Sequence, residues 1–413
     1  MKPRAITGFG VASALGVGRE VFLASYGEGQ RACAEPRPVE TFDSSPYPEA
    51  RVAEVRDFDA TRHLGDKGLR SLDRLAKLLV VASRLALHDA GLKRDGAWAP
   101  AERPWPERAG IVVSNAYGSL EAITELDRVA VLEDARYINP SRFPLTVSNS
   151  AAGYVSIWED LRAANVSVSD GNCGALDAVA CADVLLDQGR ADALLVGGAE
   201  AMSEALFLAF HRLRAIGAGS SGAGGPCLGE GAAIFALERT RAAAARGAGV
   251  LAEIVGYGTS FAAPEREGAL VHATPVALEQ AIASALGDAG VAPREVDLVV
   301  SGVSGLRVFD EAELLAIERV LGKDTPVVAP KLVLGETLGA GGAMGILAAI
   351  SHLYAAPPHG AAAARSPRAR DTAPPPAPTW VRGTARAAAR IALVTSVGYY
   401  GNASALVMRA ASR

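Results

Sequence analysis

The sequence predicts an α/β protein with buried β-sheets, and three observations lead to this fold class. Apolar β-branched runs alternate with segments whose apolar residues recur at helical spacing, a pattern typical of sheets covered by helices. Residues 249–413 repeat the outline of residues 1–248, which indicates a duplicated core with two similar halves. Half of the 413 residues are hydrophobic, so the chain can bury large sheets.

The first half is expected to contain four strands and four helices. The strands are expected at 4–12, 111–113, 193–196 and 231–237, and the helices at 72–90, 121–131, 175–188 and 239–246. The helix at 72–90 has the strongest pattern, because Leu75, Leu78, Ala82 and Leu85 share one face. Residues 30–66 are polar and contain proline, and 217–225 are rich in Gly and Ser, so both are expected to be irregular.

The second half follows the same order of elements. Strands are expected at 251–257, 296–300, 326–329, 391–395 and 404–408, and helices at 275–289, 310–321 and 339–354. Residues 355–389 are dominated by Pro, Ala and Arg and are expected to form a low-complexity loop.

Composition excludes several classes of function. A net charge of −4 gives no electrostatic reason to expect nucleic-acid binding. No apolar run is long enough to span a membrane, and the N-terminus lacks the apolar core of a signal peptide. The four cysteines have no paired spacing, which indicates a reducing compartment without a disulfide framework. We therefore expect a cytoplasmic protein, and the sequence indicates neither a metal site nor a cofactor.

One turn, Asp170 to Asp177, has the form of a catalytic turn. A β-branched run leads into it and a helix of small residues leads out, so its side chains lie at a helix N-terminus that favours negative charge. Acyl-transferring enzymes often place a nucleophile on such a turn. The turn carries Asn172 with Cys173 beside it, and the function depends on which of the two occupies the nucleophile position.

Six further motifs, taken in their order, resemble the β-ketoacyl synthase family, which has the duplicated thiolase fold with five αβαβα layers. The motifs are Ile6-Thr7-Gly8-Phe9-Gly10, the helix from Asp73 to Leu92, Ala191 to Glu200, Leu228 to Ala233, and the pair Gly339 to Ala343 with Ser396 to Asn402. The resemblance covers nearly the whole chain. It implies acyl transfer through a thiolate, assisted by two histidines that promote malonyl decarboxylation and stabilise the enolate.

All three catalytic positions of this family are lost here. Counting back from Gly189 and Gly197 places the nucleophile position on Asn172, and an amide cannot form an acyl thioester. Counting back from Asp310 places the first histidine at Gly302, and Glu336 stands in place of the second, while Lys331 is retained. None of the chain's six histidines lies at a strand end beside these turns.

Within the family, the chain resembles the chain length factors, the ketosynthase-like β subunits of type II polyketide synthases. These usually carry Gln at the lost cysteine, so Asn172 is a departure. The resemblance implies a catalytically inactive subunit that pairs with an active ketosynthase α subunit, serves an acyl carrier protein and forms the end wall of the product tunnel. The wall positions fall on Ala116, Tyr117, Ser119, Leu120, Ile123 and Thr124. The small Ala116 favours a longer, rod-shaped chain such as a polyene, whereas Tyr117 and Ile123 oppose it.

Several alternatives stay open at this point. Asn172 is either functional or a structural turn residue, and Cys173 is either a small packing residue or the nucleophile of a divergent acyltransferase. Glu336 either pairs with Lys331 or caps its helix. Glycines 339–342 lack the Lys and Ser/Thr of a phosphate loop, so close helix packing is expected. A thiolase-fold scaffold without a polyketide role is the third hypothesis.

Overall fold

The computed structural model describes residues 1–27, 39–47, 52–99, 105–213, 215–216, 226–354 and 389–411. The loops expected at 217–225 and across most of 355–389 lie outside these residues. Within the described ranges, every helix is too short or too polar to cross a bilayer.

The sheet repeats one strand order in both halves of the chain. Its order is β13-β12-β14-β15-β11-β1-β10-β8-β6-β7, with β2 (Gly16–Val17) paired to β1. The first half supplies β1 (Arg4–Ser13), β6 (Ala109–Ser114), β7 (Asn165–Val168), β8 (Ala193–Glu200) and β10 (Gly231–Arg239). The second supplies β11 (Ala252–Phe261), β12 (Leu298–Val300), β13 (Val327–Val328), β14 (Ile391–Val397) and β15 (Asn402–Ala410). Outward from the central β1–β11 contact, each half has two antiparallel pairings followed by two parallel ones, which confirms the duplication.

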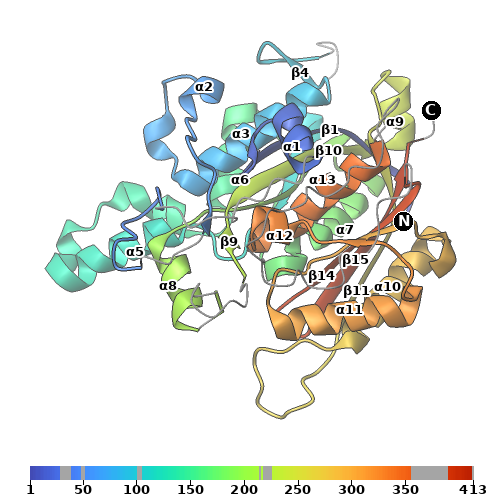
Figure 1. Ribbon diagram of the computed structural model, residues 1–413. Coiled ribbons are helices and arrows are strands. Elements are labelled where there is room, and N and C mark those ends of the chain that lie inside the picture. Colours follow the sequence, from blue (N-terminus) through green and yellow to red (C-terminus); the bar gives the residue numbers. More distant parts are fainter. Residues whose placement is uncertain are drawn as a thin grey trace, which may run out of the picture.

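Five layers result from the way helices cover the strands (Figure 1). The central helices α7 (Gly174–Asp187) and α13 (Gly341–Tyr354) pack between the two halves in the largest apolar core. Helices α3 (Arg74–Asp89) and α6 (Ser150–Glu159) cover the outer face of the first half. Helices α10 (Pro275–Ala289) and α11 (Arg307–Leu321) cover the second. The expected duplicated thiolase fold with αβαβα layers is therefore confirmed.

Smaller elements surround these layers. They are α1 (Arg19–Gly27), α2 (Thr61–Leu64), α4 (Trp105–Arg108), α5 (Leu120–Val129), α8 (Glu204–Arg212), α9 (Thr240–Ala245), α12 (Lys331–Leu334), β3 (Val52–Ala53), β4 (Lys93–Arg94), β5 (Ala97–Trp98) and β9 (Leu228–Gly229). Helices α1, α6 and α8 were not expected from the sequence. The expectation that a strand ends at Val196 is wrong, because β8 continues to Glu200. Gly198 serves close packing there, since a Cβ atom on it would lie 2.2 Å from the Gly339 carbonyl oxygen.

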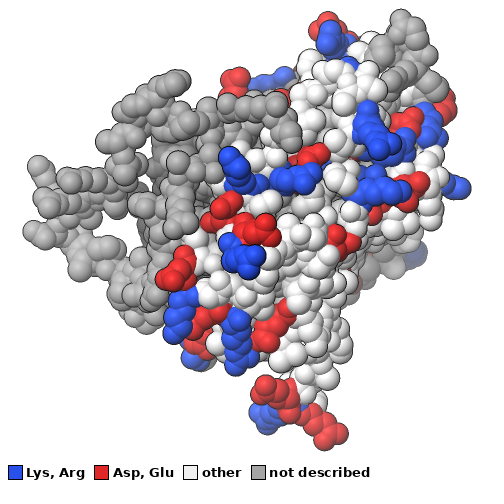
Figure 2. All heavy atoms as spheres, turned by 90° about the vertical axis from the view of Figure 1, so that its right-hand side faces the viewer, with Lys and Arg blue, Asp and Glu red and all other residues white. Residues whose placement is uncertain are grey.

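Among the described residues, Cys173 and Cys181 carry free thiols. Figure 2 shows acidic and basic side chains interspersed on the face at the right of Figure 1. The described part of that face therefore offers no extended basic surface.

Candidate functional site

The turn carrying Asn172 is a short 3₁₀ segment, Gly171–Cys173, between β7 and the first turn of α7. Asn172 is 4% exposed, and its Nδ2 donates to the Val397 carbonyl at 3.3 Å. The Ser396 hydroxyl donates to the Asn172 carbonyl at 2.7 Å, so the end of β14 locks the turn in place. Among the described residues, Oδ1 of Asn172 has no hydrogen-bond partner. The amide is thus buried on the turn where the sequence predicts the nucleophile position.

Cys173 is packed away from any substrate. Its side chain is completely buried, and Sγ lies 3.6 Å from the Ser396 carbonyl oxygen. Burial raises the pKa of the thiol, and the nearby carboxyls of Asp177 and Asp170 raise it further. Because the thiolate is the reactive form, this environment opposes nucleophilic chemistry. The geometry favours the interpretation of Cys173 as a small packing residue.

A cluster of polar side chains around Asp170 and Asp177 supports the turn that carries Asn172. The Tyr257 hydroxyl and the Ser404 hydroxyl each donate to Oδ1 of Asp177 at 2.6 Å. Asp170 lies beside Asp177 and accepts from the Asn402 amide at 2.9 Å. Burial, followed by the contact with Asp170, raises the pKa of Asp177 to about 7. Near neutral pH, the two neighbouring carboxyl groups therefore do not both carry a full negative charge. Their hydrogen bonds support the turn.

Glu336 and Lys331 form a buried ion pair beside the turn. Lys331 Nζ lies 2.7 Å from Oε1 and 3.0 Å from Oε2, and the two side chains are 4% and 1% exposed. Oε1 also accepts from the Leu338 backbone N–H at 3.0 Å, at the start of the 3₁₀ turn Leu338–Ala340. Both interpretations of Glu336 therefore hold, because the carboxylate pairs with the lysine and also caps the turn.

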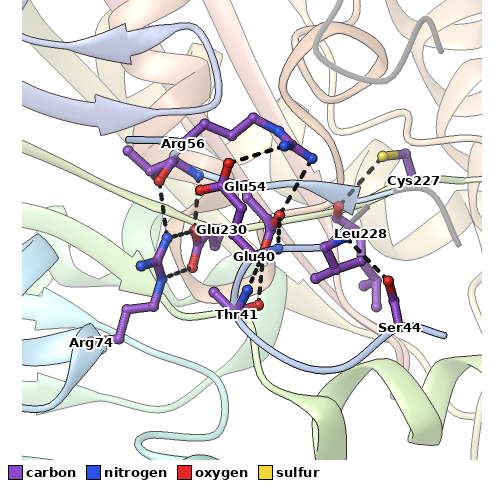
Figure 3. A network of polar contacts seen from close by, with 11 residues as sticks. Glu40, Thr41, Ser44, Glu54, Arg56, Arg74, Cys227, Leu228 and Glu230 are labelled. Atoms are coloured by element: carbon purple, nitrogen blue, oxygen red, sulfur yellow. Dashed lines mark hydrogen bonds and ion pairs between the residues drawn. The ribbon is translucent and has the colours of Figure 1, made fainter. Parts of the chain in front are cut away.

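A second buried carboxylate, Glu230, follows strand β9 and lies in a network of polar contacts with Arg74 (Figure 3). Arg74 donates to both oxygens of Glu230, and the Val55 and Met202 backbone N–H groups donate at 2.8 and 3.0 Å. The adjoining strand β9 bonds the backbone of Glu336, since the Gly229 N–H donates to its carbonyl at 2.9 Å. The position of Glu336 is thus fixed through both its backbone and its side chain.

The Gly302 position is closed by another buried carboxylate. Oε1 of Glu313 accepts from the Gly302 N–H at 2.7 Å and from the Thr395 hydroxyl at 2.6 Å. Burial raises the pKa of Glu313 to about 7. A cavity of about 10 Å³ lies between Gly302 and Lys331, which is room for about one water molecule. The space is therefore too small for an acyl chain.

Tyr399, which belongs to the motif Ser396 to Asn402, covers the site. The sequence did not reveal this role. Its hydroxyl is buried, faces Asn172 and Glu336, and has no hydrogen-bond partner within the described ranges. Burial is the first cause that raises its pKa, and the charge of Glu336 is the second. The ring packs against Phe309 with centroids 4.9 Å apart. The motif from Ser396 to Asn402 marked this segment but did not assign Tyr399 to the site.

The six wall positions lie on one segment between β6 and the middle of α5. Ala116, Leu120 and Tyr399 all pack against a small core that contains Leu338. Ser119 is buried and caps α5 by accepting from the Ala122 N–H at 3.2 Å, and the Thr124 hydroxyl donates to the Leu120 carbonyl at 2.8 Å. Tyr117 and Ile123 are 39% and 37% exposed. The segment therefore joins the site to the surface.

A larger hollow of about 1060 Å³ lies elsewhere, between the N-terminal end of α3, α5 and α8. Thr124 is the wall position that lines it, together with side chains of both signs such as Arg70, Lys77, Glu121 and Glu125. A lining of mixed charge does not suit an acyl chain. This hollow therefore does not replace the degenerate site as a candidate for acyl binding.

The described site lacks the groups of a condensing enzyme. Asn172, Gly302 and Glu336 supply an amide, a backbone N–H and a carboxylate already bound to Lys331. His272 contacts the neighbouring segment by a backbone bond to Tyr399, but its ring nitrogens face the Ala262 and Leu270 carbonyl oxygens at 3.0 and 3.3 Å. The described site is therefore a closed polar core next to the partly exposed segment 116–124.

Comparison with known proteins identifies the class. The N-terminal and C-terminal domain models of β-ketoacyl synthases match residues 1–243 and 251–358, so the chain belongs to the β-ketoacyl synthase family. It is 29% identical to a 3-oxoacyl-[acyl-carrier-protein] synthase 2 of Coxiella burnetii, covering 82% of this chain and 83% of that protein.

Two further relatives come from polyketide biosynthesis. The actinorhodin polyketide putative β-ketoacyl synthase 2 of Streptomyces coelicolor is 28% identical, over 98% of each chain. The solved structure of the ishigamide ketosynthase/chain length factor matches over 100% of both chains, with a TM-score of 0.85 and 26% identity. The chain is therefore a ketosynthase-like protein with relatives in type II polyketide synthases.

Proposed function

We propose that this protein is a chain length factor, a non-catalytic subunit that pairs with an active ketosynthase and shapes its product tunnel. One observation carries the proposal: the thiol and both imidazoles are absent together, and Glu336 and Lys331 neutralise each other inside a closed site. Loss of a single group is compatible with an altered enzyme. Loss of all three removes acyl loading, decarboxylation and enolate stabilisation, so the partner has to supply them.

An exposed strand edge supports pairing with another subunit. Strand β7 is the last strand of the sheet, pairs with β6 on one side and is partly exposed. Large apolar side chains are exposed in the neighbouring segment 117–157. They are Tyr117, Ile123, Val131, Leu132, Tyr137, Phe143, Val147 and Ile157. Unpaired edges and clustered apolar surface are features of association sites, and the active ketosynthase α subunit is the occupant that we propose.

The wall segment supports a role in product length. Tyr117 and Ile123 belong to this set of exposed apolar side chains, while Ala116 is small and packs against the core that contains Leu338. A growing chain that crosses from the partner would end against these side chains. The small Ala116 favours a longer, rod-shaped product such as a polyene, delivered and carried by an acyl carrier protein.

Co-expression with a candidate ketosynthase from the same gene neighbourhood tests the proposal. The protein alone is expected to elongate no malonyl units from a malonyl-carrier-protein thioester, and the copurified pair is expected to elongate them. Replacing the nucleophilic cysteine of the partner should abolish elongation, while Asn172→Ala should leave it above background. A homodimer of this chain that condenses malonyl units without the partner would refute the proposal.

The same preparation distinguishes the scaffold hypothesis from the proposed chain length factor. A scaffold without a polyketide role should form a stable homodimer that ignores both the ketosynthase and the carrier protein. Size-exclusion chromatography with light scattering distinguishes this from a one-to-one pair. The divergent-enzyme hypothesis is opposed by the complete burial of Cys173.

A further inference from the structure

A short bend, residues 115–119, connects β6 to α5 and carries the first wall side chains. Its N-terminal end is fixed by the Asn115 N–H, which donates to the Val168 carbonyl at 3.3 Å. Its C-terminal end is fixed by Ser119, which caps α5. Between these points, the backbone of Ala116 and Tyr117 needs another anchor to place their side chains.

Glu200, the last residue of β8, supplies that anchor. Its Oε2 accepts from the Ala116 N–H at 2.7 Å, and its Oε1 accepts from the Tyr117 N–H at 3.4 Å. Oε2 also accepts from the Gly339 N–H at 3.2 Å. All three donors are backbone groups. The residue is 1% exposed, and this burial raises the pKa of its carboxyl to about 7.

The third donor connects the bend to the degenerate site. Gly339 lies so close that a Cβ atom on it would be 2.6 Å from both the Ala116 nitrogen and the Asn115 Cα. The preceding residue, Leu338, has a φ of 47°, a left-handed conformation that is costly for a branched side chain. Its N–H is held by Glu336, and its side chain packs in the same core as Ala116. The bend therefore rests on a turn that Glu336 keeps in place.

We propose that Glu200 is a positioning residue for the tunnel wall. By binding the Ala116, Tyr117 and Gly339 amides with one carboxylate, it fixes how far the wall side chains project and thereby sets the product length. This inference rests on the proposed function as a chain length factor. Glu200 itself touches no acyl chain, because its side chain is buried behind the bend.

Glu200→Gln is the direct test, in the copurified complex with the ketosynthase. An amide has one acceptor oxygen, so it can keep the Ala116 and Gly339 bonds only by turning its NH₂ group toward the Tyr117 N–H. The glutamine NH₂ group and the Tyr117 N–H, both donors, then face each other, and the Tyr117 N–H loses its hydrogen bond. The product distribution is expected to shift by at least one two-carbon unit, while a merely structural defect would lower the total yield without changing the ratio of products.

Glu54→Gln is the matched control. Glu54 is also a buried carboxylate that binds the backbone of a bend, since it accepts from the Glu40 and Thr41 N–H groups at 2.9 Å each. It lies in the network of Figure 3 and not on the wall segment. The product ratio of Glu54→Gln should equal that of the wild type. An equal shift in both variants would overturn the proposal, because it would show a general effect of losing a buried charge.

Ala116→Trp separates this inference from the function on which it rests. If Ala116→Trp shortens the product but a folded Glu200→Gln complex gives the wild-type ratio, Glu200 is not a positioning residue. If neither variant changes the product of an active complex, the wall assignment itself is wrong. If Glu200→Gln fails to assemble, Gly339→Ala decides, since its Cβ pushes on Ala116 and leaves Glu200 intact. An unchanged product ratio in Gly339→Ala would then overturn the proposal.

Discussion

Lys331 and Glu336 are joined as a buried ion pair at the position where the sequence motifs are expected to place the family's second histidine, with Nζ 2.7 Å from Oε1. The carboxylate is also bound by the Leu338 N–H, so it is both neutralised and hydrogen-bonded. A buried charge without its partner is costly, whereas a complete pair can be close to neutral for stability. The pair therefore explains how a carboxylate can occupy this apolar position.

Lys331→Met is expected to lower the free energy of unfolding by about 3–5 kcal/mol, because it leaves Glu336 buried without its cation. The double variant Lys331→Met/Glu336→Gln should recover part of this loss, since the glutamine oxygen can still accept from Leu338. Urea unfolding of the two single variants and the double variant gives the coupling energy. Purely additive losses would show that the two groups do not interact in solution.

Cys173 is expected to resist alkylation in the folded protein. Its side chain is fully buried and its pKa is raised, first by burial and then by Asp177 and Asp170, so little thiolate is available. Iodoacetamide at pH 8, followed by peptide mass analysis, should label Cys173 only after unfolding in urea. Rapid labelling of the native protein, or an acyl adduct from a carrier-protein thioester, would instead support the divergent enzyme.

Stability should fall as pH rises toward neutrality, in part through Glu313. Burial raises its folded pKa from 4.5 to about 7, so the folded state holds a proton that the unfolded state releases between these values. The contribution is present below the unfolded pKa and is lost as pH rises through the folded one. Glu313→Gln keeps an acceptor for Gly302 and Thr395 and removes the titration.

This variant should therefore gain about 2–3 kcal/mol over the wild type at pH 8 and little at pH 4.5. Guanidinium unfolding at four pH values between these limits gives the difference. A constant difference between the two proteins across the range would mean that Glu313 does not titrate as its burial implies.

Ala116→Trp is expected to shorten the product of the complex by at least one two-carbon unit. Ala116 packs with Leu120 against the core that contains Leu338, so an indole there would project into the proposed end of the tunnel. Mass spectrometry of products from the copurified pair measures the length. Val184→Trp is the control, because it adds the same group at a 52% exposed position near the opposite end of α7 from Asn172. A shift in the control variant would point to an indirect effect.

The sequence predicted the layers because they depend on local patterns, and the degenerate positions stay a prediction. Apolar periodicity marked α3 and α10, and counting between glycines located Asn172 on its turn. It also indicated the partnership of Lys331 with Glu336, since only five positions separate them. These are relationships that a linear pattern can carry.

The remaining features depend on contacts across the fold. Glu200 lies 84 residues after Ala116 and 139 before Gly339, so no local pattern joins them. Helix α6 was missed because its small and aromatic residues give a weak helical pattern, and the glycines in β8 imitated a strand end. Tyr399 was assigned to a motif, but only the packing of β14 against the Asn172 turn brings its hydroxyl to the site.

The Lys331–Glu336 ion pair also has an evolutionary consequence. Replacing Glu336 by histidine would leave the Lys331 ammonium in the interior without its carboxylate, and replacing Asn172 by cysteine would still leave a thiol without imidazoles. Under the proposed function, each replacement taken singly gains no turnover, and the first one lowers the folding free energy. Selection acting on single substitutions would therefore meet a barrier, and the proposed dependence on a ketosynthase would persist.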